Sequence, residues 1–125
     1  MYDIYFYEDA RGNEPVLDYI MELRDKQDKD SRIKLSKIDD YIEALRQYGT
    51  QAGLPYLKHL SGKIWELRPI RDRILFAAWV GGGFVLLHPF LKQTQKTPQR
   101  EIEQAKRELA DIIERGFKDG RSEKI

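Results

Sequence analysis

Residues 64–92 read IWELRPIRDRILFAAWVGGGFVLLHPFLK, and this stretch decides the fold. It divides into three strand-like segments, residues 64–70, 73–80 and 84–92, which are rich in β-branched and aromatic side chains. Two and three residues separate these segments, whereas parallel strands need a crossover of a dozen or more residues. The stretch therefore predicts a three-stranded antiparallel meander with a tight turn at residues 81–83.

The sequence on either side of the meander predicts one further strand and three helices. Alternating side chains over residues 2–7 indicate a strand, and residues 51–61 are predicted to be irregular. Apolar residues recur at helical spacing over residues 16–23 and 38–45, and again over residues 102–113. We therefore predict an α+β fold. Its N-terminal strand joins the meander in one antiparallel sheet, packed with two N-terminal helices and one C-terminal helix.

Composition predicts one soluble domain, residues 1–125, with the polar residues 117–125 as a flexible tail. The chain has no cysteine, which is typical of a reducing compartment and excludes thiol nucleophiles and iron–sulfur clusters. Residues 74–91 are apolar and about as long as a membrane span, but the glycines at 81–83 and Pro89 interrupt them. We therefore expect a cytoplasmic protein that makes no membrane contact.

Basic residues gather in one part of the chain. Residues 56–100 hold eight lysines and arginines against two acids, Glu66 and Asp72, although the whole chain has a net charge of +1. A basic block in an otherwise acidic small protein predicts a surface for phosphates, and a solvated face with scattered lysines is the alternative interpretation. The residues assigned to binding an RNA backbone are Lys58, Lys63, Arg71 and Arg100.

The usual catalytic templates are missing from the sequence. With two histidines, no cysteine and no H-E-x-x-H motif, we expect no metal site, and we expect no cofactor. The glycines at 81–83 precede a predicted strand rather than a helix, which favours a hairpin turn over a phosphate-binding loop. No serine lies in a nucleophile-elbow motif. The chemistry is therefore expected to rest on cationic side chains of the sheet.

Five residues are the candidate catalytic set. A meander brings the end of one strand beside the start of the next, so Arg68 and Arg73 should lie near each other. His88 and Lys92 share a face of the last predicted strand, and Lys96 follows in the polar connector. Cations that converge on one groove can hold an RNA backbone and stabilise the extra negative charge of a phosphorane-like transition state.

Each candidate also has a structural interpretation. Arg68 could pair with Glu66 or Asp72, and Arg73 could be an ordinary strand-end arginine. His88 precedes Pro89 and could be a hydrogen-bonded structural histidine. The two connector lysines, and Lys58 with its neighbouring histidine, could be simply solvated.

Three motifs together resemble the phage-derived, HigB-like branch of the RelE/ParE toxin superfamily. They are WELRP at residues 65–69, RILF at residues 73–76 and LLHPFLKQTQKTPQREIEQA at residues 86–105. The resemblance implies a compact RelE-like fold and the toxin of a type II toxin–antitoxin pair. It also implies an endoribonuclease that cuts mRNA in the ribosomal A site without a metal, by attack of the ribose 2′-hydroxyl on the adjacent phosphate.

The resemblance also implies residue roles and partners. Arg68 and Arg73 match the family's sheet arginines, Lys92 and Lys96 match the cationic end of the last strand and its connector, and His88 matches the histidine of the H-x-F motif. Many members carry a second lysine where glutamine follows Lys92 in this chain. The implied partners are the ribosome, mRNA and a HigA-like helix-turn-helix antitoxin, through which alone the toxin would reach operator DNA.

Two other functions are compatible with the same fold. A ParE-like toxin would inhibit DNA gyrase by binding and would cut no RNA, and an inactive phage-derived module would only bind a partner. The local basic block favours the nuclease, because a protein that acts only by binding has no need of converging cations.

Overall fold

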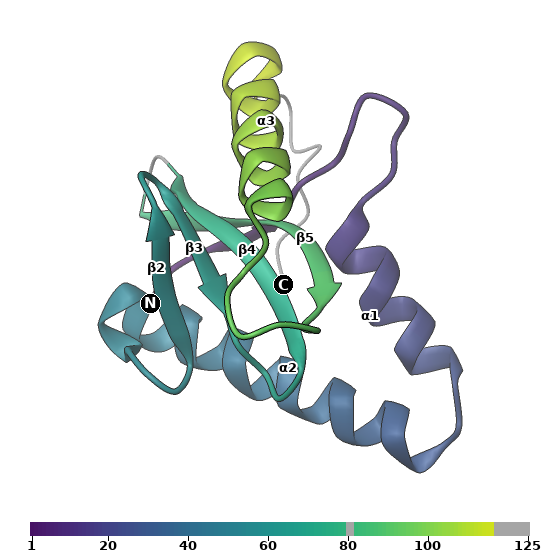
Figure 1. Ribbon diagram of the computed structural model, residues 1–125. Coiled ribbons are helices and arrows are strands. Elements are labelled where there is room, and N and C mark those ends of the chain that lie inside the picture. The colour runs from purple at the N-terminus through teal and green to yellow at the C-terminus, as the bar shows by residue number, and fades with distance from the viewer. Residues whose placement is uncertain (80–81, 117–125) are drawn as a thin grey trace.

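The computed structural model describes residues 1–79 and 82–116 (Figure 1). The predicted α+β fold is confirmed, with two α-helices between the first and second strands and one after the last strand. The predicted tail, residues 117–125, and part of the predicted turn at 81–83 lie outside the described residues. In chain order the elements are β1 (Ile4–Phe6), α1 (Pro15–Asp25), α2 (Lys29–Tyr48), the 3-10 helix η1 (Gly49–Ala52), β2 (Leu57–Ser61), β3 (Ile64–Leu67), β4 (Asp72–Trp79), β5 (Gly83–Leu91) and α3 (Gln99–Arg115).

The sheet has five strands in the order β1-β5-β4-β3-β2. β3, β4 and β5 form the predicted antiparallel meander. β1 joins the same sheet, as predicted, but it runs parallel to β5, with Ile4 opposite Phe84. The sheet is therefore mostly antiparallel, with one parallel pair at the β1 edge.

The prediction that residues 51–61 are irregular is wrong, because they contain the end of η1 and an additional strand, β2. Leu57 is buried and pairs with Leu67, whereas Lys58 and His59 are exposed at the sheet edge. A five-residue edge strand with two adjacent exposed polar residues shows little of the alternation that marks a half-buried strand. β2 places Lys58 opposite Glu66 of β3.

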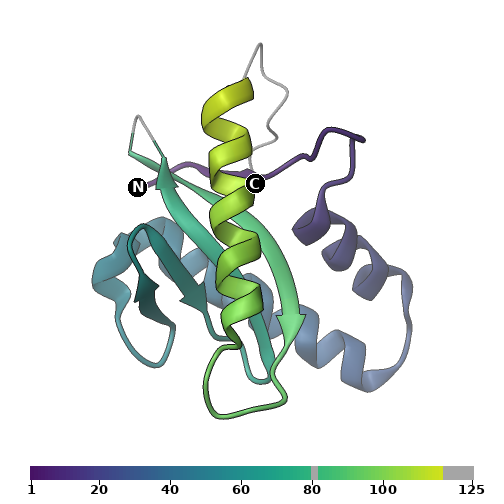
Figure 2. The same cartoon turned by 45° about the horizontal axis from the view of Figure 1, so that its top comes forward.

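Helices cover both faces of the sheet. Figure 2 shows α3 crossing one face, with α2 behind the other. On the α2 side, the fully buried Phe76 belongs to a core that includes Ile38 and Ile42 of α2. On the α3 side, Leu75 of β4 packs in a second cluster with Ala105 and other residues of α3. α3 begins part of the way along the sheet, after the last connector, residues 92–98.

A bulge in β5 changes which side chains face α3. In the β4–β5 ladder His88 lies opposite Leu75, but Leu86 lies opposite Phe76, so Leu87 is an extra residue in β5. Leu86 consequently belongs to the core on the α2 side, whereas Leu87 belongs to the cluster on the α3 side. After the extra residue the alternation is reversed, and His88 and Phe90 face the α3 side.

Candidate active site

A pocket of about 280 Å³ lies on the α3 side of the sheet, where β3, β4 and β5 meet the last connector. Five basic side chains and one carboxylate line it, so the pocket has the charge that a phosphate needs. Four of the five predicted catalytic residues meet there, together with Lys58 from the predicted RNA-binding set. The charged lining residues are Lys58, Glu66, Arg68, Arg73, Lys92 and Lys96.

Glu66 holds the two arginines at the floor of the pocket. Its carboxylate is buried, with Oε2 3.4 Å from Nε of Arg68 and Oε1 4.0 Å from Nε of Arg73. Arg68 therefore pairs with Glu66 and not with Asp72, whose carboxylate accepts a hydrogen bond from the Tyr19 hydroxyl at 2.7 Å on the other side of the sheet. Arg68 remains one quarter exposed and can reach a ligand while paired.

Arg73 is a buried arginine that also closes the turn between β3 and β4. Its Nη1 donates to the carbonyl oxygens of Ile70 at 2.9 Å and of Asp72 at 2.8 Å. Ile70 has a φ of 55°, a left-handed conformation that is costly for a β-branched residue. Burial lowers the pKa of Arg73, and the charge of Glu66 opposes that effect. Arg73 thus combines a structural role in the turn with a positive charge beneath the pocket.

The three lysines of the pocket are available for an anion. Lys58 and Lys96 are exposed and Lys92 is half-buried. Within residues 1–79 and 82–116, none of the three forms an ion pair. They come from β2 and from the connector, so they surround the arginines from two sides.

The connector is fixed to the sheet by Glu66. Thr97 donates its hydroxyl proton to Glu66 Oε1, and the Lys92 amide donates to the Arg71 carbonyl at 2.8 Å. Glu66 therefore orders both the arginines and the segment that carries the lysines. From the sequence, Glu66 was predicted only as a possible partner of Arg68. Its alternation with Arg68 along the strand was the signal for a shared face, but the bond to Thr97 joins segments far apart in the sequence.

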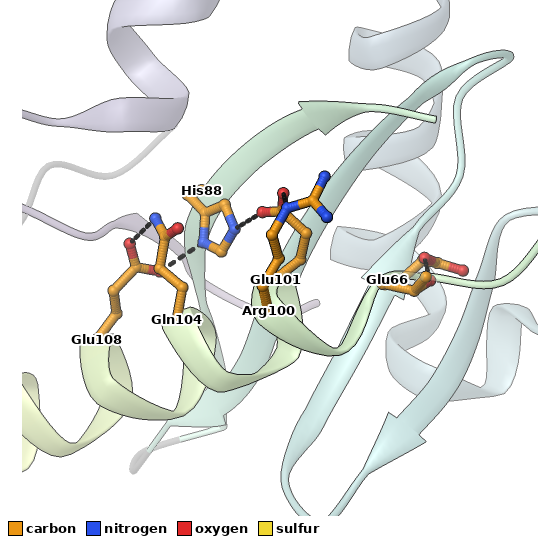
Figure 3. Close-up of polar contacts among 7 residues, drawn as sticks. Glu66, His88, Arg100, Glu101, Gln104 and Glu108 are labelled. Atoms are coloured by element: carbon orange, nitrogen blue, oxygen red, sulfur yellow. Dashed lines mark hydrogen bonds and ion pairs between the residues drawn. The ribbon is translucent and has the colours of Figure 1, made fainter. Parts of the chain in front are cut away.

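His88, the fifth predicted catalytic residue, lies outside the pocket lining. It is buried between two carboxylates of α3, with Nδ1 2.7 Å from Glu108 and Nε2 2.9 Å from Glu101 (Figure 3). Burial alone would lower the pKa of His88, but the hydrogen bonds and charges of Glu108 and Glu101 outweigh it and raise the pKa. The geometry is that of the structural histidine described above, which attaches α3 to β5.

The remaining predicted RNA-binding residues lie around the pocket rather than in it. Arg71 lies in the β3–β4 turn and lines an adjoining hollow with Lys92. Arg100 is exposed on the first turn of α3, 3.7 Å from Glu101, and lines a hollow beside the connector. Lys63 is exposed in the turn between β2 and β3 and is absent from the pocket lining.

No group of three histidine, aspartate or glutamate side chains in residues 1–79 and 82–116 is placed to hold a metal ion. In the same part of the chain, no helix combines the length and the apolar character needed to cross a membrane.

We expect His88 to make the stability of the fold depend on pH. A raised pKa means that the protonated imidazole is the form that the fold stabilises. That stabilisation is complete below the unfolded pKa of about 6.5 and is lost as the pH rises through the folded value. The melting temperature should therefore fall from about pH 6.5 to pH 9 more steeply for the wild type than for His88→Gln. Gln51→Ala, a change at an exposed residue with no titratable side chain, is the control and should keep the wild-type profile.

One protein-family model matches most of the chain, including the pocket. A family model described as phage-derived protein Gp49-like (DUF891) matches residues 18–110. No curated protein matches the chain. The matched region runs from α1 into α3 and contains every residue that lines the pocket.

Proposed function

The chain belongs to the phage-derived Gp49-like family, a family of RelE-like toxins, and on that premise we propose that it is a HigB-like toxin that cuts mRNA on the ribosome. The observation that carries this proposal is the convergence of five basic side chains on one pocket, with both arginines ordered by the buried Glu66. A toxin that acts only by binding gyrase has no need of such a pocket.

The proposed reaction is a transesterification within the RNA. The ribose 2′-oxygen attacks the adjacent phosphorus and loses its proton, and the bond to the 5′-oxygen breaks as that oxygen gains a proton. The products are a 2′,3′-cyclic phosphate and a 5′-hydroxyl. Arg68 and Arg73 stabilise the charge that develops on the phosphate oxygens. The three lysines bind the RNA backbone, and Lys92 and Lys96 are the groups in the pocket proposed for proton transfer.

The proposed partners follow from the same role. The ribosome presents the mRNA, and a HigA-like helix-turn-helix antitoxin neutralises the toxin in the cytoplasm. His88 is not included in the proposed chemistry, because both of its ring nitrogens are engaged by α3.

Expression of the chain alone should arrest growth by stopping protein synthesis before DNA synthesis. The measurement is incorporation of labelled amino acids and thymidine after induction, with primer extension on translated mRNA. New 5′ ends inside coding regions, present only in induced cells, are the expected result. Gyrase-linked DNA breaks with intact mRNA would instead support the ParE-like alternative.

The ends of the cleaved RNA should report the mechanism. Attack by the 2′-hydroxyl leaves a 2′,3′-cyclic phosphate and a 5′-hydroxyl, so the downstream fragment should be ligatable only after treatment with a 5′ kinase. Its control is the same mRNA cut by a metal-dependent nuclease that leaves 5′-phosphates. A 5′-phosphate on the toxin's product would rule out the proposed reaction.

A further inference from the structure

Phe90 lies beside the arginines but has no part in the chemistry proposed above. In the β4–β5 ladder it is directly opposite Arg73, so the two side chains are neighbours on the α3 side of the sheet. It is half-buried and lines the cationic pocket. It also lines a second hollow of about 670 Å³ that extends along the connector to the start of α3.

The position of Phe90 differs from that of the core aromatics. Phe76 is fully buried and Phe84 is nearly so, whereas Phe90 packs against the α3-side cluster from its edge and leaves part of its surface in the pocket. Its ring centroid is 6.4 Å from that of His88, with the two rings tilted by 40°. Proteins that bind single-stranded RNA commonly place a partly exposed aromatic side chain among basic residues. The basic residues contact the phosphates, and a base stacks on the aromatic ring.

Amide side chains border the same space. Gln93 and Gln95 line the pocket, and neither side chain forms a hydrogen bond with another described residue. Each amide offers donors and an acceptor, which is the combination needed to pair with the edge of a base. Gln99 also lines the pocket, but it donates to Glu103 at 2.7 Å on its own helix.

We propose that Phe90 is the stacking platform for one nucleobase next to the scissile phosphate, and that Gln93 and Gln95 hydrogen-bond the edge of that base. This inference rests on the proposed function and gives it a source of sequence preference. Phosphate contacts to the arginines and lysines carry no sequence information, whereas a base held on Phe90 beside two free amides can be distinguished from other bases.

The test compares Phe90→Leu with Phe90→Trp in cleavage of ribosome-bound mRNA. Stacking of one base corresponds to about a 5- to 150-fold effect, so Phe90→Leu should lower the cleavage rate by that factor and Phe90→Trp should retain it. The matched control is Phe84→Leu, the same change at a core aromatic outside the pocket, which should lower the melting temperature and leave cleavage by the folded protein unchanged.

Sequencing of the cut ends tests the role of the amides. Gln93→Ala with Gln95→Ala should broaden the distribution of bases at the cut site, whereas Lys58→Ala should lower cleavage equally at all sites. Equal cleavage by wild type, Phe90→Leu and Phe90→Trp, with an unchanged base distribution in the glutamine variant, would overturn the inference while leaving the nuclease in place. Failure of the wild type to cut any mRNA would instead overturn the proposed function. If Phe90→Leu does not fold, loss of cleavage in a folded Phe90→Trp would also count against stacking.

Discussion

Replacing Arg68 with alanine is expected to lower mRNA cleavage about 10²–10³-fold and to abolish toxicity, while the protein stays folded. The proposed role of Arg68 is to meet negative charge that develops only in the transition state, where loss of one preorganised donor has its full effect. Its contribution to stability is smaller, because the side chain is one quarter exposed and water can fill the space that the guanidinium leaves in the pocket.

Three further variants make the Arg68 result interpretable. Arg68→Lys keeps the charge but loses the planar fork of donors, so partial activity is expected. Arg107→Ala removes an exposed arginine of α3 that is outside the pocket lining and should retain the activity. Arg73→Ala should lose both activity and stability, because Arg73 is buried and holds the turn at Ile70. If Arg68→Ala were as toxic as the wild type, the active site would not be on this face of the sheet.

Replacing Glu66 with leucine is expected to lower the free energy of unfolding by about 3–5 kcal/mol. Glu66 is 3% exposed and lies between Arg68 and Arg73, so its loss leaves the buried Arg73 guanidinium without its ion-pair partner. The same change removes the acceptor of the Thr97 hydroxyl and releases the connector. Urea denaturation measured at neutral pH gives the free energy directly.

A double variant separates the charge effect from simple loss of packing. Glu66→Leu with Arg73→Leu leaves no unpaired charge at the buried position, so it should be more stable than Glu66→Leu alone. Glu103→Leu is the control, because Glu103 pairs with Lys106 at an exposed site on α3 and should contribute about 0–1 kcal/mol. A Glu66→Leu effect as small as that of Glu103→Leu would show that the carboxylate does not hold the floor of the pocket.

The sequence was sufficient to predict the meander because its three strands are apolar, dense and closely spaced. It was also sufficient to predict that Arg68 and Arg73 lie near each other, because the end of one strand of a meander lies beside the start of the next. β2 was missed because Lys58 and His59 lie exposed next to each other at an edge and hide its alternation.

The rest of the site depends on contacts that no local pattern contains. The extra residue Leu87 turns the side chains of His88 and Phe90 toward α3. The alternation of side chains along a strand does not show where such a bulge occurs, so the sequence alone could not predict this change of face. The acids that engage His88, Glu101 and Glu108, come from a helix whose sequence shows only an amphipathic stripe. Because these contacts could not be predicted from the sequence, His88 was a candidate for catalysis there. In the structure His88 lies beneath α3.

The parallel pair at the β1 edge has a consequence for how quickly the protein assembles. β1 is among the first elements of the chain to be synthesised, yet its strand partner is β5, so its hydrogen bonds must wait until most of the chain exists. Closing so long a loop costs entropy before any contact repays it, and such non-local pairing slows folding. The pocket has the same requirement, because its lining extends from Lys58 to Ile102. A nascent chain therefore has no assembled pocket until translation of the domain is nearly finished.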